Sequence, residues 1–318
     1  MNAEGHRLLR RTAQRGRRSG RWLRSEEVSP PRGDFLHFLG TGGNPSGVIA
    51  QRPRTGGIWL NLAGTALALD PGPGAAYHAA RAGLDSHALA AVLISHGHTD
   101  HHLGAGALIE GMCYGMSRRR GVLALPQAAL AAGLVGPFHL GREPSRWYQG
   151  GPDVVTWRAG QTLAVLGVRV TPFAVHHGPE NYGLKFEGGG LRIVYSSDAT
   201  YVLDYLDEAG ALRAVRGGEE LLPPAKVRTV RGELTDALRG ADLAILNVGF
   251  FWQFAHRHLT AVGAAELLRR SGVPRAILTH FDRSTAPDAD AIAAYVAAES
   301  GARVWAAHDG LRLPIAGT

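Results

Sequence analysis

Four side chains that can bind a metal ion are concentrated in residues 95–101, Ser-His-Gly-His-Thr-Asp-His. They are His96, His98, Asp100 and His101. The apolar segment 91–94 comes directly before them, and a strand that ends in a tight turn can direct alternate side chains into one cavity. Imidazole and carboxylate ligands without thiolate suit zinc, manganese or iron(II), and two such ions can activate water near neutral pH. The run predicts a metal site, because an ordinary polar loop leaves this concentration of ligands unexplained.

The run resembles the His-x-His-x-Asp-His signature of the metallo-β-lactamase superfamily. The resemblance implies a third His, a bridging carboxylate and a final His, each after another strand. Residues 176–183, His-His-Gly-Pro-Glu-Asn-Tyr-Gly, follow the alternating segment 168–175 and are similar to the His-Gly-x-x-x-x-Gly turn of the ribonuclease Z-like branch. This similarity implies that His177 is a ligand. His176 is the weaker candidate, because neighbouring residues of an extended strand point to opposite faces.

Two further segments supply the remaining ligands in the same comparison. Residues 191–198 are strand-like and end in Tyr-Ser-Ser-Asp, similar to the Tyr-Ser-x-Asp segment of the branch, which implies that Asp198 is the bridging carboxylate. Taken alone, an Asp that closes a strand is commonly a turn former or a helix N-cap. Residues 275–281 end in Leu-Thr-His-Phe, also as in the branch, and imply that His280 is the final ligand.

His258 begins the sequence His-Leu-Thr-Ala and matches a His of the branch that assists the leaving group without binding metal. Nearby negative charge favours a protonated His, so we expect His258 to be a general acid. The alternative is an ordinary residue at the start of a helix.

The resemblance implies two divalent metal ions, with zinc favoured and manganese or iron as alternatives. Seven ligands are divided between the ions: His96, His98 and His177 for the first, Asp100, His101 and His280 for the second, and Asp198 between them. The expected catalytic residues are Asp100 and His258.

Flanking segments extend the resemblance to residues 34–313. Residues 35–43 form an apolar strand that enters a glycine turn, similar to the Phe-Leu-Gly-Thr-Gly opening of ribonuclease Z-like chains. The turn after residues 67–69 contains Asp70 and resembles the Asp-x-Gly turn of the superfamily, which implies that Asp70 positions the metal-binding loops without binding metal itself. Residues 307–311 resemble the terminal strand pair of these folds.

Strand-like segments alternate with helical stretches, for which residues 79–90 and 260–270 are examples, and this alternation predicts an α/β fold. The superfamily implies a four-layer αββα sandwich with the metals at one sheet edge. The chain has 318 residues, 45% of them apolar, which is enough for a large core. Because no linker divides residues 34–318, we expect them to form one hydrolase domain.

Most of the net charge of +7 is concentrated at the N-terminus. Residues 1–33 hold nine Arg and three Glu, a net charge of 9 − 3 = +6. We expect a basic, flexible arm that could contact nucleic acid, although a solvated tail without a specific role explains the charge equally well.

The single Cys, Cys113, excludes a disulfide within the chain and favours a reducing, cytoplasmic location. No apolar run approaches the ~20 residues that cross a membrane, so we expect no membrane contact. The expected partners are a small-molecule or nucleotide-like substrate and, as an oligomeric state, a second copy of the chain in a homodimer.

Two departures from ribonuclease Z bear on the substrate. The long arm that grips tRNA in that enzyme lies between the third His and the bridging Asp, but His177 and Asp198 are only 21 residues apart. Extra sequence at residues 213–233 predicts an exposed loop or lid. The order of ligands resembles the branch that contains ribonuclease Z and small phosphodiesterases, so we expect hydrolysis of a small or cyclic phosphodiester rather than of tRNA. The alternatives are a hydrolase of acyl esters, thioesters or lactones, an iron oxygenase, and a binding protein without enzymatic activity.

Overall fold

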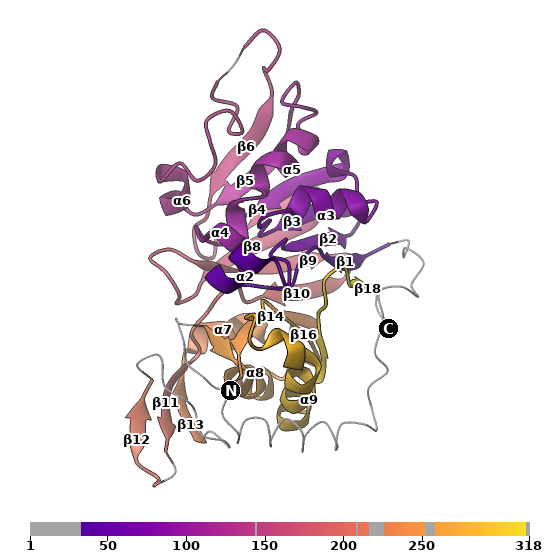
Figure 1. The fold of residues 1–318 in the computed structure, drawn as a ribbon. Helices are drawn as coiled ribbons and strands as arrows, with labels where there is room; N and C mark the ends of the chain where they lie inside the picture. The colour runs from indigo at the N-terminus through magenta and orange to yellow at the C-terminus, as the bar shows by residue number, and fades with distance from the viewer. Residues whose placement is uncertain (1–32, 144, 208, 216–225, 252–257, 316–318) are drawn as a thin grey trace.

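The computed structural model describes residues 33–143, 145–207, 209–215, 226–251 and 258–315. Of the expected arm at residues 1–33, only Gly33 falls within this part. Most of the described chain forms two stacked sheets with helices on both outer faces (Figure 1).

The first sheet has seven strands. Their order across the sheet is β18 (Arg312–Pro314), β1 (Phe35–Phe38), β2 (Ile58–Leu62), β3 (Thr65–Leu69), β4 (Leu89–Leu93), β5 (Arg119–Leu125) and β6 (Gly151–Thr156). The strands from β3 to β6 run parallel to one another, and those from β18 to β3 pair antiparallel.

The second sheet is built from the C-terminal half of the chain. Its order is β17 (Arg303–Ala306), β16 (Arg275–Thr279), β14 (Leu243–Phe250), β10 (Leu191–Tyr195), β9 (Tyr182–Gly188), β8 (Val168–Ala174) and β7 (Leu163–Val165), with the short β15 (Leu259–Thr260) paired to β14. The strands from β10 to β17 are parallel, whereas β7 to β10 form antiparallel hairpins.

Helices flank the two sheets on opposite sides, as Figure 1 shows. Those of the N-terminal half are α2 (Asn44–Ala50), α3 (Ala75–Arg81), α4 (Thr99–His102), α5 (Ala105–Met112) and α6 (Gln127–Ala131). Those of the C-terminal half are α7 (Gly232–Leu238), α8 (Ala261–Ser271) and α9 (Ala289–Ser300), and the 3₁₀ turns are η1 (Ser86–Ala88) and η2 (Ala286–Asp288).

The alternation of side chains along each strand divides the apolar residues into separate cores. On β3, Leu67 and Leu69 pack between the two sheets, whereas Ala66 and Ala68 pack against α3 and α5. On β14, Ile245 packs between the sheets while its neighbours face α8 and α9. Because successive side chains of a strand point to opposite faces, each buried strand contributes to two cores. The expected αββα sandwich is therefore confirmed.

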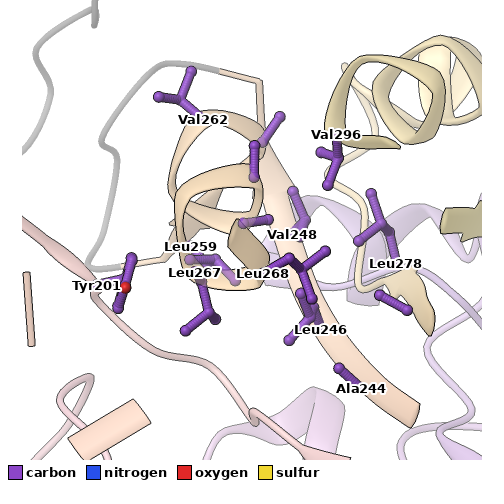
Figure 2. Packing of buried hydrophobic residues seen from close by; sticks show 14 of the residues in the cluster. Tyr201, Ala244, Leu246, Val248, Leu259, Val262, Leu267, Leu268, Leu278 and Val296 are labelled. Carbon is purple, nitrogen blue, oxygen red and sulfur yellow. The ribbon is translucent and has the colours of Figure 1, made fainter. Parts of the chain in front are cut away.

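Figure 2 shows the outer core of the C-terminal half. Leu246 and Val248 of β14 lie beside Leu267 and Leu268 of α8, and all four are buried. Helix α8 begins as expected, because the side chain of Thr260 accepts a hydrogen bond from the backbone N–H of Gly263. This packing fixes the end of β14 and the segment that starts with His258.

Three expectations about secondary structure are wrong. The helix expected at residues 79–90 ends at Arg81, since Gly83 adopts a left-handed φ of 70°, and η1 and β4 follow. Residues 307–311 are not strands but the turn between β17 and β18, which belong to different sheets.

The third wrong expectation concerns residues 213–233, for which we expected a loop. Strands β12 (Leu212–Ala214) and β13 (Lys226–Val230) pair with β11 (Val202–Leu206) in a third sheet that projects from the sandwich, and α7 follows (Figure 1). Residues 216–225 lie outside the described part. Among the described residues, none of the helices has the length and apolar character that a membrane crossing requires.

Candidate metal centre

The eight candidate side chains come from loops at one edge of the sandwich, where parallel strands of both sheets end. Strand β4 leads to His96 and His98 and then to helix α4, which carries Asp100 and His101. The other four lie next to strands of the second sheet. His177 follows β8, Asp198 follows β10 and His280 follows β16, whereas His258 directly precedes β15. The structure brings all eight together in overlapping groups of possible ligands.

The first group surrounds one oxygen of Asp198. Nδ1 of His98 lies 3.0 Å from Nε2 of His96 and 3.1 Å from Nε2 of His177. Oδ2 of Asp198 lies 3.7 Å from Nε2 of His96 and 3.6 Å from Nε2 of His177. His98 is exposed and the other three residues are buried, so the group opens to solvent on the His98 side.

The second group adjoins the first through the same carboxylate. Nε2 of His280 lies 3.1 Å from Nε2 of His101 and 3.2 Å from Oδ2 of Asp100. Asp198 places Oδ2 at 3.4 Å from Nε2 of His101 and Oδ1 at 3.3 Å from Nε2 of His280. Asp198, which is 1% exposed, thus lies between the two groups.

The backbone is strained where it supports this cluster. Asp70, Ser197 and His280 have positive φ values of 47°, 54° and 63°, which are uncommon for residues with a side chain. Gly43 lies against His280 so closely that a Cβ on Gly43 would be 2.0 Å from the imidazole. Only glycine allows this approach, which positions the His280 ring.

Asp70 orients the cluster from behind, as expected from the sequence. Its Oδ2 lies 2.8 Å from Nδ1 of His101 and accepts hydrogen bonds from the hydroxyls of Ser95, at 2.6 Å, and Tyr195, at 2.8 Å. Its Oδ1 accepts a hydrogen bond from the backbone N–H of Ser95 at 2.6 Å. With a proton on Nδ1 donated to Asp70, Nε2 of His101 keeps its lone pair for a ligand.

Sequence reasoning missed the amides that hold the carboxylates. Nδ2 of Asn247 donates to Oδ1 of Asp198 at 2.8 Å, and Nδ2 of Asn181 donates to the Asp198 carbonyl at 2.6 Å. The backbone N–H of Asn44 donates to Oδ2 of Asp100 at 2.9 Å. Asn181 lies in the same loop as His177, which was an available signal, whereas Asn44 begins α2 and Asn247 lies within β14.

Opposite charges in the cluster hold one another in place. Burial opposes ionisation of Asp198, but the imidazoles of His280, His101 and His258 keep its pKa well below the usual range. Burial likewise opposes a charged His101, but Asp198 and its neighbouring carboxylates raise the pKa of His101 well above its ordinary value. A divalent cation bound by these nitrogens would compete with protons for them, so we expect metal binding to weaken as the pH falls.

His258 lies at the rim of both groups. Its Nδ1 is 3.7 Å from Oδ2 of Asp198, and its ring stacks at 5.5 Å from that of His280. The sequence argument that nearby negative charge keeps His258 protonated is wrong for this structure. Burial outweighs the effect of Asp198 and lowers the pKa of His258 to about 3, so the imidazole is neutral at pH 7.

The donor set fits divalent cations. Ring nitrogens lie 3.0–3.1 Å from one another in both groups. A neutral imidazole has one nitrogen with a free lone pair and an ionised carboxylate only accepts hydrogen bonds, so the groups supply several electron-pair donors for a cation. Nδ1 of His258 and Nδ1 of His280 are buried without a hydrogen-bond partner in the described part of the chain. Imidazole and carboxylate together are ligands for zinc, manganese and iron.

Comparisons with known proteins agree with the fold and the cluster. A family model described as a beta-lactamase superfamily domain matches residues 65–217, which include five of the expected ligands and the bridging Asp198. Ribonuclease Z of Kineococcus radiotolerans is 28% identical over 86% of this chain and 93% of its own length. An uncharacterized protein of Methanocaldococcus jannaschii, MJ1374, is 34% identical over 55% of this chain, and the match spans only 65% of that relative.

Among solved structures, the metallo-β-lactamase fold protein YhfI from Bacillus subtilis superposes with a TM-score of 0.65 at 15% identity, over 89% of this chain and 99% of its own. The chain is therefore a metallo-β-lactamase-fold protein. Its sequence is similar to that of ribonuclease Z. The fold and the His and Asp groups together indicate divalent metal binding and support a metal-dependent hydrolase.

Proposed function

We propose that this protein hydrolyses phosphodiesters with two divalent metal ions, zinc first among them. The observation that carries the proposal is the position of Asp198, with its carboxylate oxygens 3.3–3.7 Å from ring nitrogens of both groups. The proposed ligands are His96, His98 and His177 in one group, Asp100, His101 and His280 in the other, and Asp198 shared between them.

Each proposed role follows from the contacts of the residue. When bound, two divalent ions would polarise the phosphoryl group and lower the pKa of a water molecule. Asp198 holds the two halves of the site together, and Asp70 fixes the tautomer of His101. His258 presents a neutral imidazole to the leaving oxygen and can donate a hydrogen bond as negative charge develops there.

Hydrolysis assays on matched substrates test this proposal. We expect the metal-loaded protein to hydrolyse bis(p-nitrophenyl) phosphate and to leave lactones and thioesters intact. The reverse preference would identify an acyl hydrolase, because activated water attacks carbonyl groups as well as phosphoryl groups. Metal analysis that finds only iron, together with oxygen consumption, would identify an oxygenase on the same fold.

Metal stoichiometry provides a separate prediction. We expect elemental analysis of the metal-replete protein to find close to two ions per chain, since seven ligands exceed the four that one tetrahedral ion takes. Dialysis against a chelator should remove both ions together with the activity. A value of one ion or fewer in the replete sample would contradict the shared role of Asp198.

The hairpin β9–β10 supports a small or nucleotide-like substrate. Gly189 and Gly190 connect the two strands directly, so the segment between His177 and Asp198 forms one short hairpin. The third sheet, β11–β13, lies after Asp198 instead. No long arm between the third His and the bridging carboxylate is therefore available to hold a large substrate.

We also propose that residues 1–33 are an arm outside a hydrolase domain at residues 34–318. Removing residues 1–33 eliminates +6 of charge but none of the proposed ligands. We expect turnover of bis(p-nitrophenyl) phosphate to persist within about twofold, while affinity for nucleic acid falls and loses part of its salt dependence. Loss of small-substrate turnover or of folding in the truncated protein would contradict this division.

A further inference from the structure

A cavity of about 610 Å³ lies outside the metal centre. Its volume lies in the range of small-molecule sites. The residues that line it are Gln51, Arg52, Pro53, Arg54, Arg283, Ala286, Pro287 and Asp309. None of these residues belongs to the proposed metal site.

Two consecutive glycines connect Pro53 of this cavity with His280. A Cβ on Gly43 would be 2.0 Å from the His280 ring, and a Cβ on the preceding Gly42 would be 2.9 Å from Cγ of Pro53. Since consecutive Cα atoms are about 3.8 Å apart, the rings of Pro53 and His280 are at most about 12 Å from each other. Arg283, which also lines the cavity, follows His280 by three residues in the sequence.

The cavity carries an excess of positive charge, with three arginines and one carboxylate. Asp309 is already occupied: Oδ1 accepts from the backbone N–H and the hydroxyl of Thr41, and Oδ2 accepts from the backbone N–H of Arg54. The guanidinium of Arg54 is only loosely paired with Asp309, at 3.8 Å. Arg52 and Arg283 are exposed, and neither forms an ion pair with any carboxylate in the described part of the chain.

We propose that this cavity binds a second phosphate group of the substrate, next to the phosphodiester that is hydrolysed. Guanidinium groups match the oxygens of phosphate with paired hydrogen bonds, and two of the three here have no competing carboxylate. The proposal rests on the proposed phosphodiesterase function, and it narrows the substrate to an oligonucleotide or another molecule with two or more phosphates.

Binding to the metal-free, full-length protein tests the cavity separately from catalysis. The probe is a uridine trinucleotide with a fluorescent label, followed by anisotropy at several salt concentrations. The double variant Arg52→Gln/Arg283→Gln should bind it about tenfold more weakly, with a shallower salt dependence, because two phosphate contacts are lost. The control is Arg142→Gln/Arg158→Gln, which removes the same charge from exposed arginines elsewhere and should bind like the native protein.

Kinetics of the metal-loaded protein supply the second measurement. Bis(p-nitrophenyl) phosphate has one phosphate, so its kcat/KM should be equal in the native protein and both variants, whereas KM for the trinucleotide should rise only in Arg52→Gln/Arg283→Gln. Equal trinucleotide affinity in both double variants would overturn the cavity proposal, as would inorganic phosphate displacing the probe at micromolar concentration. If the native protein hydrolysed no phosphodiester, the proposed function would be wrong. The binding measurement on the metal-free protein would then decide by itself whether the cavity binds phosphate.

Discussion

Asp198→Ala is expected to reduce turnover of bis(p-nitrophenyl) phosphate by at least about 10³-fold and to lower the metal content of the purified protein well below two ions per chain. Its carboxylate is the group that both halves of the cluster share, with Oδ2 3.6 Å from Nε2 of His177 in the first group and Oδ1 3.3 Å from Nε2 of His280 in the second. Removing it leaves buried imidazoles with less negative charge to balance a cation. Elemental analysis and initial rates on the same sample measure both effects.

Folding must be separated from catalysis in this experiment, because Asp198 is buried and hydrogen-bonded. Asp198→Asn keeps the shape of the side chain and should fold, yet it should also lose metal because the charge is gone. Asp236→Ala removes an exposed carboxylate that pairs only with Arg239 among the described residues and serves as the control. A native rate in Asp198→Asn with two bound ions would reduce Asp198 to a turn residue.

The site could be predicted from the sequence because its residues follow strands. A buried strand such as β4 is recognised from its apolar residues, and a polar run directly after it must lie at the sheet edge. Asp198 and His280 were assigned from the resemblance to the ribonuclease Z-like branch, and the structure places them after β10 and β16 in the same cluster. The sequence does not show which side chains form hydrogen bonds with one another in the folded protein. The hydrogen bonds from the amides of Asn247 and Asn181 to Asp198 were therefore missed.

The errors in secondary structure also have physical causes. Residues 79–90 are rich in alanine, which favours a helix, but Gly83 in a left-handed conformation ends α3 and Asp85 caps η1. In residues 213–233, mixed charge and two prolines favoured a loop, whereas pairing with β11 turns β12 and β13 into strands. The end of α3 depends on a local signal that was overlooked, whereas the pairing with β11 depends on contacts that a local pattern does not contain.

His258→Ala separates the two roles that the geometry allows, proton donor and ligand. His258 lies with Asp198 and His280 in a group that could hold a metal ion, although the family resemblance assigns it to the leaving group. If His258 acts on the leaving group, the variant should keep both ions and lose about 10²- to 10⁴-fold in rate on an alkyl phosphodiester. Metal content and rate are measured on the same preparation, with the exposed His308→Ala as control.

The leaving group provides the decisive comparison. Because burial lowers the pKa of His258 to about 3, its imidazole is neutral before the reaction, and its contribution must come from a hydrogen bond that its N–H donates to the departing oxygen. p-Nitrophenolate departs without such help, so the rate on bis(p-nitrophenyl) phosphate should fall much less than the rate on an alkyl ester. An equal loss on both substrates with the metals retained would contradict the leaving-group role. Loss of one ion in His258→Ala would instead make His258 a ligand shared with Asp198 and His280.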